Sequence, residues 1–331
     1  MPNVLVTPRE VAPFAPRFQD ALEAAGLTLV FPLPGEANLL TPTELRAALV
    51  GVEATIAGSE AYPAELFAEH PQLRVVARVG VGFDAVDTVA ATAAGVAVCT
   101  APGTNQESVA EHVFALMLGF TRHVVTRTNG IRAGAWPRHF SLPLRGQTLG
   151  LAGLGRIGKA VATRAVAFGM NVIAFDPAAD ATFAGANGVR LVSFAELLAA
   201  SDFLSLHLPL TPTTRHVMDA VAFAAMKPTA VLVNTSRGGL VNEAALVAAL
   251  KAGKLAGALL DVLEEEPPPA DHPLFACENV ILTPHAAGVD VRSLGDMARS
   301  AAEAIASLWK GEWPAEKVVN PAVRPAFRWG R

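Results

Sequence analysis

The sequence contains few charged residues, only two cysteines and no long hydrophobic run. Charged residues make up 17% of the 331 residues, and the formal net charge is −4. Lys and Arg form no stripe, so the sequence does not favour binding to nucleic acid or to an anionic membrane. A small anionic substrate must then be held by individual cationic side chains.

The two cysteines, Cys99 and Cys277, both lie among apolar residues. They lack the spacing of a metal site, so we expect no metal and interpret both as reduced thiols of a cytoplasmic protein. Residues 1–6 lack a basic segment followed by an apolar one, and no secretory signal is predicted. Charges or glycines interrupt every apolar stretch before it reaches the length of a membrane span, so we expect no contact with a membrane.

Short apolar segments alternate with Ala- and Leu-rich segments of helical period in the first third of the chain. This alternation predicts a parallel sheet that is covered by helices on both faces. The predicted strands are Val4–Val6, Leu27–Phe31, Ala54–Ile56, Val75–Ala77 and Val96–Cys99, and the predicted helices are Phe18–Ala25, Glu44–Val50, Ala64–Glu69 and Val86–Ala93.

A long helix is predicted at Gln106–Arg127. Its apolar residues cover more than one stripe, which indicates burial on more than one side. A subunit interface would explain this pattern, and so would burial between two domains of one chain.

A second alternating series begins at Thr148 and predicts about six strands, the size of a complete dinucleotide-binding sheet. An Ala-rich helix is predicted near residues 290–308, and we expect the proline-containing tail after it to be extended. The predicted strands are Leu149–Ala152, Val172–Phe175, Phe203–His207, Val231–Asn234, Gly257–Asp261 and Val280–Thr283.

A glycine-rich loop joins the first strand of this series to a predicted helix at 156–168. In this context a G-x-G-x-x-G pattern predicts a dinucleotide site, because the first glycine allows a tight turn and the second admits the pyrophosphate. The third lets helix and strand pack closely, and the helix N-terminus offers amides to the phosphates. The alternative is a glycine-rich turn without a ligand. The loop consists of Gly153, Leu154, Gly155, Arg156, Ile157 and Gly158.

Asp176 follows the second strand, 23 residues after Gly153. A carboxylate there accepts hydrogen bonds from the adenosine ribose and repels a 2′-phosphate. No Lys or Arg follows before Arg190, so the sequence predicts NAD rather than NADP. The alternative is that Asp176 caps the turn before Pro177.

Two charged or titratable residues follow strand ends in the second half. Arg237 comes after the strand predicted at 231–234, and His285 after the strand predicted at 280–283. Ligands of such sheets bind at the carboxyl ends of strands. A guanidinium can hold a keto acid's carboxylate and stabilise charge on its carbonyl oxygen, and an imidazole can transfer the proton. A surface arginine and a structural histidine are the alternatives.

A carboxylate beside His285 would favour the protonated ring and fix its orientation. Three successive glutamates are candidates, Glu264, Glu265 and Glu266. Spacing alone does not choose among them, and an exposed acidic run is the alternative explanation.

Together these motifs resemble the D-isomer-specific 2-hydroxyacid dehydrogenase family, and in particular its phosphoglycerate dehydrogenase-like members. The resemblance covers nearly the whole chain, and as an ordered set its motifs are highly specific. The matching segments are residues 77–84, residues 108–112, the glycine-rich loop with Asp176, residues 207–211, residues 234–238, Asp261 with Glu266-Pro267, and residues 283–285.

The resemblance implies a catalytic triad of Arg237, Glu266 and His285, which selects Glu266 among the three glutamates. It implies that NAD is the cofactor and that a small D-2-hydroxy acid and its 2-keto acid are the substrates. Substrate contacts are implied at Arg78, Val79 and Gly80, and cofactor contacts at the glycine-rich loop, Asp176, His207, Pro209, Thr214, Thr235, Asp261 and Gly288.

The resemblance also implies an α/β fold with two doubly wound parallel-sheet domains. A flavodoxin-like substrate domain would comprise residues 1–102 and 289–331, and a Rossmann NAD-binding domain of residues 103–288 would be inserted into it. A homodimer built on the helix predicted at Gln106–Arg127 is implied as well.

The chain departs from the family pattern at a few positions. Phosphoglycerate dehydrogenases carry an arginine near the strand end where this chain has Ala57-Gly58-Ser59, although Arg78 could still meet a phosphate. The candidate substrates are therefore 3-phosphoglycerate, glycerate/hydroxypyruvate and glyoxylate. Glu266 argues against formate dehydrogenase relatives, which pair glutamine with histidine. No regulatory domain follows Asn320-Pro321, so we do not expect serine feedback.

Two other functions are weighed against the hydroxyacid dehydrogenase. An NAD(H)-sensing co-repressor-like protein would bind the dinucleotide without turnover, but the complete triad argues against it. In an NAD-dependent dehydrogenase of another family, the glycine-rich loop and Asp176 would have the same roles. The presence of Arg237, Glu266 and His285 at the triad positions would then be a coincidence.

Overall fold

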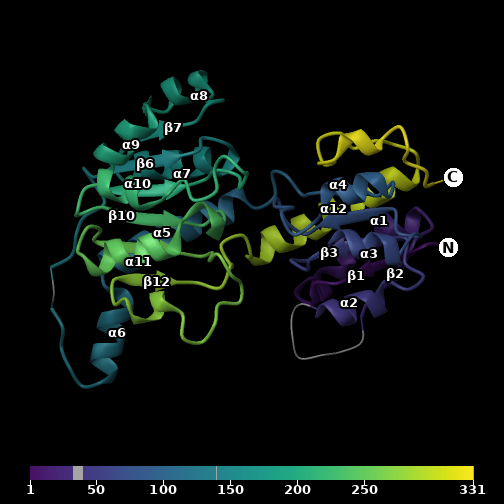
Figure 1. Ribbon diagram of the computed structural model, residues 1–331, viewed down its shortest axis with the longest axis horizontal. Coiled ribbons are helices and arrows are strands. Elements are labelled where there is room, and N and C mark those ends of the chain that lie inside the picture. Colours follow the sequence, from purple (N-terminus) through teal and green to yellow (C-terminus); the bar gives the residue numbers. More distant parts are fainter. Residues whose placement is uncertain (33–39, 139, 331) are drawn as a thin grey trace. The chain divides into compact units, whose positions relative to one another are not determined.

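The computed structural model describes residues 1–32, 40–138 and 140–330. The chain divides into two compact units. The smaller unit contains Met1–Asn105 and Val289–Arg331, and the larger unit contains Gln106–Gly288. Each unit is built around a parallel sheet, so the predicted α/β class with two doubly wound sheets is confirmed (Figure 1).

The sheet of the smaller unit has the strand order β2-β1-β3-β4-β5, which is the flavodoxin-like order. Its strands are β1 (Asn3–Val6), β2 (Thr28–Val30), β3 (Ala54–Ala57), β4 (Val75–Arg78) and β5 (Ala97–Cys99). Its helices are α1 (Gln19–Ala24), α2 (Pro42–Ala48), α3 (Ala64–Glu69), α4 (Thr88–Ala93) and α12 (Val291–Trp309), with short 3-10 segments at Arg9–Arg17 and Pro321–Val323.

Alternate strand residues of this sheet enter two different cores, as the two-residue period of a strand requires. Val4 and Val6 pack under α12, whereas Leu5 packs against α2 and α3 on the other face. Asp290 is the N-cap of helix α12, and its carboxylate accepts hydrogen bonds from the amides of Arg292 and Ser293.

The tail after α12 is not extended, contrary to the prediction. The side chain of Asn320 binds the backbone of Val98 in β5 and of Val96 just before β5, and a 3-10 turn follows directly. Proline restricts the backbone but does not prevent a turn, and these buried hydrogen bonds hold the tail along the edge strand.

The sheet of the larger unit has the order β12-β11-β10-β9-β6-β7-β8. The direction of strand succession reverses between β6 and β9, the place where such sheets bind dinucleotides. Its strands are β6 (Thr148–Ala152), β7 (Asn171–Phe175), β8 (Val189–Leu191), β9 (Phe203–Leu206), β10 (Val231–Asn234), β11 (Gly257–Leu260) and β12 (Val280–Leu282). Its helices are α5 (Gln106–Thr121), α6 (Val124–Arg132), α7 (Arg156–Ala167), α8 (Ala181–Ala186), α9 (Phe194–Ala200), α10 (Ala220–Ala225) and α11 (Glu243–Lys251), with 3-10 segments at Gly238–Leu240 and Pro273–Ala276.

Two predictions for this unit were wrong in detail. The sheet has seven strands rather than about six, because the edge strand β8 has only three residues and exposes Arg190 and Leu191. The long helix predicted at Gln106–Arg127 is two helices, since His123 adopts a left-handed conformation (φ 54°) between α5 and α6.

The apolar residues of α5 pack mainly inside the larger unit. Val113, Phe114 and Met117 belong to the same core as β6 and α7. Helix α6 contains no buried residue. The subunit interface and the burial between two domains, which were considered for the long apolar helix, are therefore not needed to explain most of α5. Helix α6, in contrast, exposes Val124, Val125 and Ile131.

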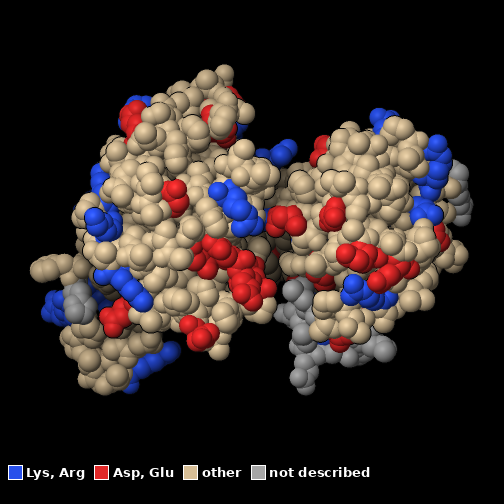
Figure 2. All heavy atoms as spheres, in the orientation of Figure 1, with Lys and Arg blue, Asp and Glu red and all other residues tan. Residues whose placement is uncertain are grey.

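None of the described helices is both long and apolar enough to cross a bilayer. On the face drawn in Figure 2, Lys and Arg side chains of the described residues lie in small, separate groups among neutral atoms. An anionic ligand on this face would meet local cations rather than a continuous basic surface.

Candidate active site

The glycine-rich loop connects β6 to α7 and has little room for side chains at two of its three glycines. A Cβ at Gly153 would lie 2.5 Å from the carbonyl oxygen of His207, and the φ of Gly153 is 105°. A Cβ at Gly158 would lie 2.3 Å from the carbonyl oxygen of Gly153, so α7 packs directly against the turn. A Cβ at Gly155, in contrast, meets no atom within 4 Å. Open space at the helix N-terminus fits a bound phosphate group.

Asp176 follows β7 and binds the glycine-rich loop through its carboxylate. Its Oδ2 accepts a hydrogen bond from the amide of Leu154 at 2.7 Å, and its Oδ1 accepts one from the amide of Ala178 at 2.8 Å. The residue thus caps the turn after β7 and also brings negative charge to the loop. This position agrees with a role in favouring a ribose hydroxyl over a phosphate.

Thr235 has a buried hydroxyl that fits a ligand. The residue is 8% exposed, and its Oγ1 makes no hydrogen bond with any described residue. A buried hydroxyl without a partner is unfavourable, and a bound dinucleotide at this end of β10 would supply one. Thr214, in contrast, donates to the carbonyl of Pro209 at 2.7 Å and stabilises the turn after β9.

His207 lies at the carboxyl end of β9 and stays uncharged. Burial lowers the pKa of its imidazole to about 4, and its Nε2 contacts the hydroxyl of Ser205 at 2.9 Å. A neutral, fixed ring beside the turn at Gly153 keeps the loop's shape and adds no charge to the dinucleotide site.

The segments after β10 and β11 touch through their backbones at Gly238. A Cβ on Gly238 would lie 1.9 Å from the carbonyl of Leu263, so only glycine permits this approach. Arg237 directly precedes Gly238, and its Nη1 donates to the carbonyl of Ser236 at 2.6 Å. Since Glu266 lies three residues beyond Leu263, Arg237 and Glu266 stand on two segments in direct contact.

Glu266 and His285 form a short hydrogen bond. Nδ1 of His285 lies 2.6 Å from Oε2 of Glu266, and the amide of Leu263 donates to the other carboxylate oxygen at 2.9 Å. The carboxylate therefore holds one ring nitrogen and leaves Nε2 for a substrate. His285 itself has a φ of 53°, and its amide donates to the carbonyl of Asp261 at 2.7 Å.

Asp261 stabilises the segment that carries His285. The residue is 1% exposed, and its carboxylate accepts hydrogen bonds from the hydroxyl of Thr283 and the amides of Ala286 and Ala287 at 2.6–2.9 Å. Burial acts to raise the pKa of Asp261, but these bonds and His112 outweigh it, and the net pKa lies below the usual value. The negative charge of Asp261 is thus maintained in the interior.

His112 contacts the segment that carries His285, although the sequence predicted no role for it. It projects from α5, and its Nε2 lies 2.9 Å from the hydroxyl of Thr283 and 3.5 Å from Oδ1 of Asp261. The helix therefore helps to hold the His285 segment. The spacing of a lone histidine on a helix carries no signal for such a distant contact.

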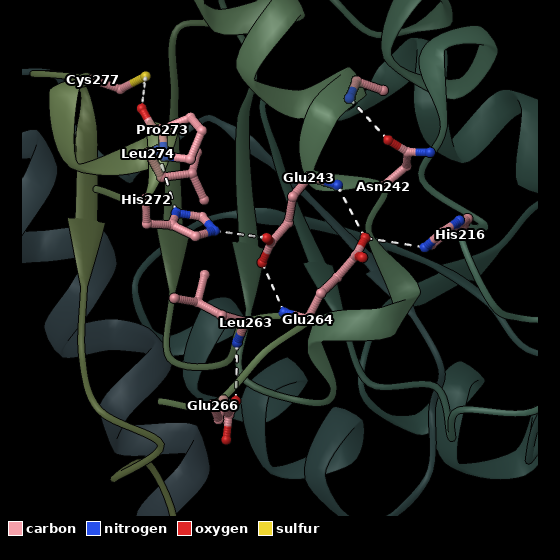
Figure 3. A network of polar contacts seen from close by, with 11 residues as sticks. His216, Asn242, Glu243, Leu263, Glu264, Glu266, His272, Pro273, Leu274 and Cys277 are labelled. Carbon is pink, nitrogen blue, oxygen red and sulfur yellow. Dashed lines mark hydrogen bonds and ion pairs between the residues drawn. The ribbon is translucent and has the colours of Figure 1, made fainter. Parts of the chain in front are cut away.

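A second set of polar contacts supports the segment that carries Glu266, as Figure 3 shows. Glu243, the first residue of α11, accepts a hydrogen bond from the amide of Glu264 at 2.8 Å and pairs with His272 at 3.0 Å. Glu264 in turn accepts from the amide of Glu243 at 3.2 Å and contacts His216 at 3.0 Å. Glu264 is therefore a structural member of the acidic run, distinct in its contacts from Glu266.

Arg78, Val79 and Gly80 lie at the carboxyl end of β4 in the smaller unit. The amide of Val79 donates to the carbonyl of Ala57, and the carbonyl of Gly80 accepts from the amide of Ala101, both at 2.8 Å. A Cβ at Gly80 would meet no atom within 4 Å, so a ligand can approach the backbone there. Arg78 is buried.

The sequence matches a known family model and named relatives. Residues 114–287 match the model described as "D-isomer specific 2-hydroxyacid dehydrogenase, NAD binding domain". The chain is 42% identical over 274 residues to a glyoxylate reductase of Korarchaeum cryptofilum, covering 80% of this chain and 82% of the relative. It is 44% identical over 263 residues to a D-3-phosphoglycerate dehydrogenase of Methanocaldococcus jannaschii, covering 78% of this chain but only 50% of that relative.

The fold also matches a solved structure that contains a cofactor and a hydroxy acid. The D-lactate dehydrogenase of Aquifex aeolicus, complexed with NAD and lactic acid, superposes with a TM-score of 0.82 at 28% identity. The match covers 96% of this chain and 99% of that chain. The fold and the family model therefore agree on an NAD-binding larger unit.

We predict that Gly155→Ala weakens NADH binding by at least about tenfold, or about 1.4 kcal/mol, without loss of stability. Its methyl group would enter only open space in the protein and would meet the pyrophosphate. Gly153→Ala should instead lower the melting temperature, because its methyl group would collide with the carbonyl of His207. Fluorescence titration with NADH and thermal unfolding measure the two effects.

Gly185→Ala is the matched control, since it also adds a methyl group to open space but within α8. It should leave NADH affinity unchanged and stabilise the helix by about 0.5–1 kcal/mol. Wild-type affinity in Gly155→Ala would contradict the assignment of this loop.

Proposed function

The chain belongs to the D-isomer specific 2-hydroxyacid dehydrogenase family, and we propose that Arg237, Glu266 and His285 carry out its NAD-dependent interconversion of a D-2-hydroxy acid and the matching 2-keto acid. The observation that carries the proposal is the 2.6 Å contact between His285 and Glu266. Arg237 lies on a segment whose backbone touches the segment of Glu266 at Gly238. Such a substrate requires a cation that binds its carboxylate and an imidazole that transfers the proton while a carboxylate holds the ring.

NAD supplies the hydride chemistry when it is bound. The residues of the chain bind the substrate, stabilise the negative charge on its carbonyl oxygen and transfer the proton. Arg237 binds the substrate carboxylate and stabilises negative charge on the carbonyl oxygen during reduction. His285 donates a proton from Nε2 to that oxygen, and in the reverse direction it accepts the proton of the hydroxyl. Glu266 holds Nδ1 and stabilises the protonated ring.

The substrate is a small 2-hydroxy or 2-keto acid, and three candidates remain from the sequence analysis. The relatives are named glyoxylate reductase and D-3-phosphoglycerate dehydrogenase, so both glyoxylate and 3-phosphoglycerate have a named relative. Glycerate with hydroxypyruvate is the third pair. The chain spans about half the length of the phosphoglycerate dehydrogenases that it matches. We do not retain the co-repressor alternative, because these relatives are enzymes.

We predict that His285→Ala and Arg237→Ala each lower kcat/KM for keto acid reduction by about 100-fold or more, since proton transfer and charge stabilisation are each worth that much. NADH affinity should stay within about threefold of wild type, a difference below 1 kcal/mol. Steady-state assays at the absorbance of NADH give the first quantity, and fluorescence titration gives the second.

Glu265→Ala serves as the control, because it removes an exposed carboxylate from the same acidic run. It should keep near-wild-type kcat/KM. Near-full activity in His285→Ala or Arg237→Ala would show that the corresponding role is misassigned.

We further propose that the enzyme is a cytoplasmic homodimer. Both cysteines are free thiols, which suits a reducing compartment. Apolar side chains that are each more than half exposed gather on α6 and the residues after it, and such a cluster favours a protein partner. They are Val124, Val125, Ile131, Trp136, Phe140 and Leu142.

We predict that wild-type protein sediments as a dimer and that the double variant Trp136→Asp/Phe140→Asp sediments as a monomer with an intact fold. Two charges placed in a desolvated apolar interface would oppose association. Val221→Asp, at an equally exposed apolar position of α10, is the control and should remain dimeric. A wild-type monomer at micromolar concentration would contradict this proposal.

A further inference from the structure

Helix α5 contacts the segment that carries His285 on both sides of that residue. The hydroxyl of Ser108 donates to the carbonyl of Ala287 at 2.8 Å, and Nε2 of His112 lies 2.9 Å from the hydroxyl of Thr283. Ser108 and His112 are one helical turn apart, so both side chains lie on the same face of α5. All of these residues belong to the larger unit.

The hydrogen bond between His112 and Thr283 has a defined direction. The hydroxyl of Thr283 donates its only hydrogen to Oδ1 of Asp261 at 2.6 Å. Burial acts to raise the pKa of Asp261, but its hydrogen bonds lower it below the usual value, so the carboxylate is ionised and can only accept. The hydroxyl therefore accepts from His112, whose Nε2 carries a hydrogen. Since Nε2 is 3.5 Å from Oδ1 of Asp261, the shorter connection to the carboxylate runs through Thr283.

Asp261 connects this chain of hydrogen bonds to the backbone around His285. Its carboxylate accepts from the amides of Ala286 and Ala287 at 2.9 and 2.8 Å, and its carbonyl accepts from the amide of His285 at 2.7 Å. His285 has a left-handed conformation (φ 53°), which is unfavourable for a residue with a Cβ and persists only where its surroundings hold it. The contacts with Asp261 and α5 provide such surroundings.

Helix α5 is suited to holding this segment because the core of the larger unit fixes the helix. Val113, Phe114 and Met117 pack in the same core as β6 and α7, and Ser108 is buried. The side chain of His285, in contrast, is 44% exposed, so packing around its ring does not define its position. Hydrogen bonds from a fixed helix to the segment can define it.

We propose that His112 is a positioning residue, which increases the rate of proton transfer by holding the segment of His285 in place. It acts through Thr283 and Asp261, and Ser108 holds the other side of the segment. This inference rests on the proposed function and adds a residue to it. A proton donor must lie within hydrogen-bonding reach of the reacting oxygen, so a displaced His285 lowers kcat more than it weakens substrate binding.

The test measures kcat and KM with NADH and the fastest wild-type substrate among glyoxylate, hydroxypyruvate and 3-phosphohydroxypyruvate. The number of NADH-binding sites, from fluorescence titration, gives the enzyme concentration. We expect His112→Ala to lower kcat by about tenfold or more, with KM for the acid within about threefold of wild type. A residue that only stabilised the fold would reduce the number of binding sites and leave kcat per site unchanged.

Three further variants test whether His112 acts through Thr283. His112→Gln should restore kcat to within about threefold of wild type, because the amide nitrogen of glutamine lies as many bonds from Cα as Nε2 of histidine and can donate to the hydroxyl. Thr283→Val removes the hydroxyl at nearly constant shape and should lower kcat at least as much as His112→Ala. The double variant His112→Ala/Thr283→Val should lose no more kcat than Thr283→Val alone, because effects within one chain of hydrogen bonds are not additive.

Glu111→Gln is the control on the same helix, directly beside His112. The side chain of Glu111 is 73% exposed and forms a 3.7 Å ion pair with Arg164 of α7. The substitution removes one charge at constant shape and should leave both kcat and KM at their wild-type values.

The outcomes separate this inference from the proposed function. Wild-type kcat in His112→Ala, no recovery in His112→Gln, or multiplied losses in the double variant would overturn the role of His112 alone. If His112→Ala does not fold, Thr283→Val decides, and a wild-type kcat in that variant would overturn the role. A folded wild-type protein that binds NADH but reduces none of the three acids would overturn the proposed function itself, and the positioning role with it.

Discussion

The contact between Oε2 of Glu266 and Nδ1 of His285 is the interaction on which the proposed chemistry depends. A histidine alone can exchange a proton with solvent. Catalysis, however, needs the proton on the one ring nitrogen that faces the substrate, and it needs a ring with a fixed orientation. The carboxylate supplies both requirements, because it binds Nδ1 and stabilises the charged ring. Both side chains are partly exposed, so the pair is accessible to a substrate. Its geometry must therefore come from the segments that carry the two residues, not from burial of the pair.

The rest of the larger unit stabilises those two segments. Asp261 binds the His285 segment through a hydroxyl and two amides, and α5 adds His112. Glu243, at the start of α11, binds the amide of Glu264 next to the Glu266 turn. Gly238 allows the Arg237 segment to touch that turn. These contacts use backbone amides and buried or half-buried carboxylates, which define position better than exposed side chains do.

The sequence predicted what depends on local pattern and missed what depends on distant contacts. The period of the apolar residues predicted the alternation of strands and helices, and spacing predicted the glycine-rich loop. Arg237 and His285 became candidates because they follow predicted strand ends. Spacing did not separate Glu266 from Glu264, and only the family resemblance chose between them. The structure distinguishes them by their partners, since Glu264 contacts α11 and Glu266 contacts His285. The roles assigned to these side chains are still predictions.

The missed features share a physical cause. The break at His123, the strand β8 and the supports from Glu243 and His112 arise from tertiary packing, for which a short window of sequence holds no signal. Replacing Glu266 by glutamine and measuring kcat for keto acid reduction tests the Glu266–His285 contact most directly. We predict a kcat that is lower by about tenfold or more, because Nδ1 of His285 loses the negatively charged carboxylate that holds it, while the affinity for NADH stays at the wild-type value. An unchanged kcat in this variant would contradict the proposed role of the pair.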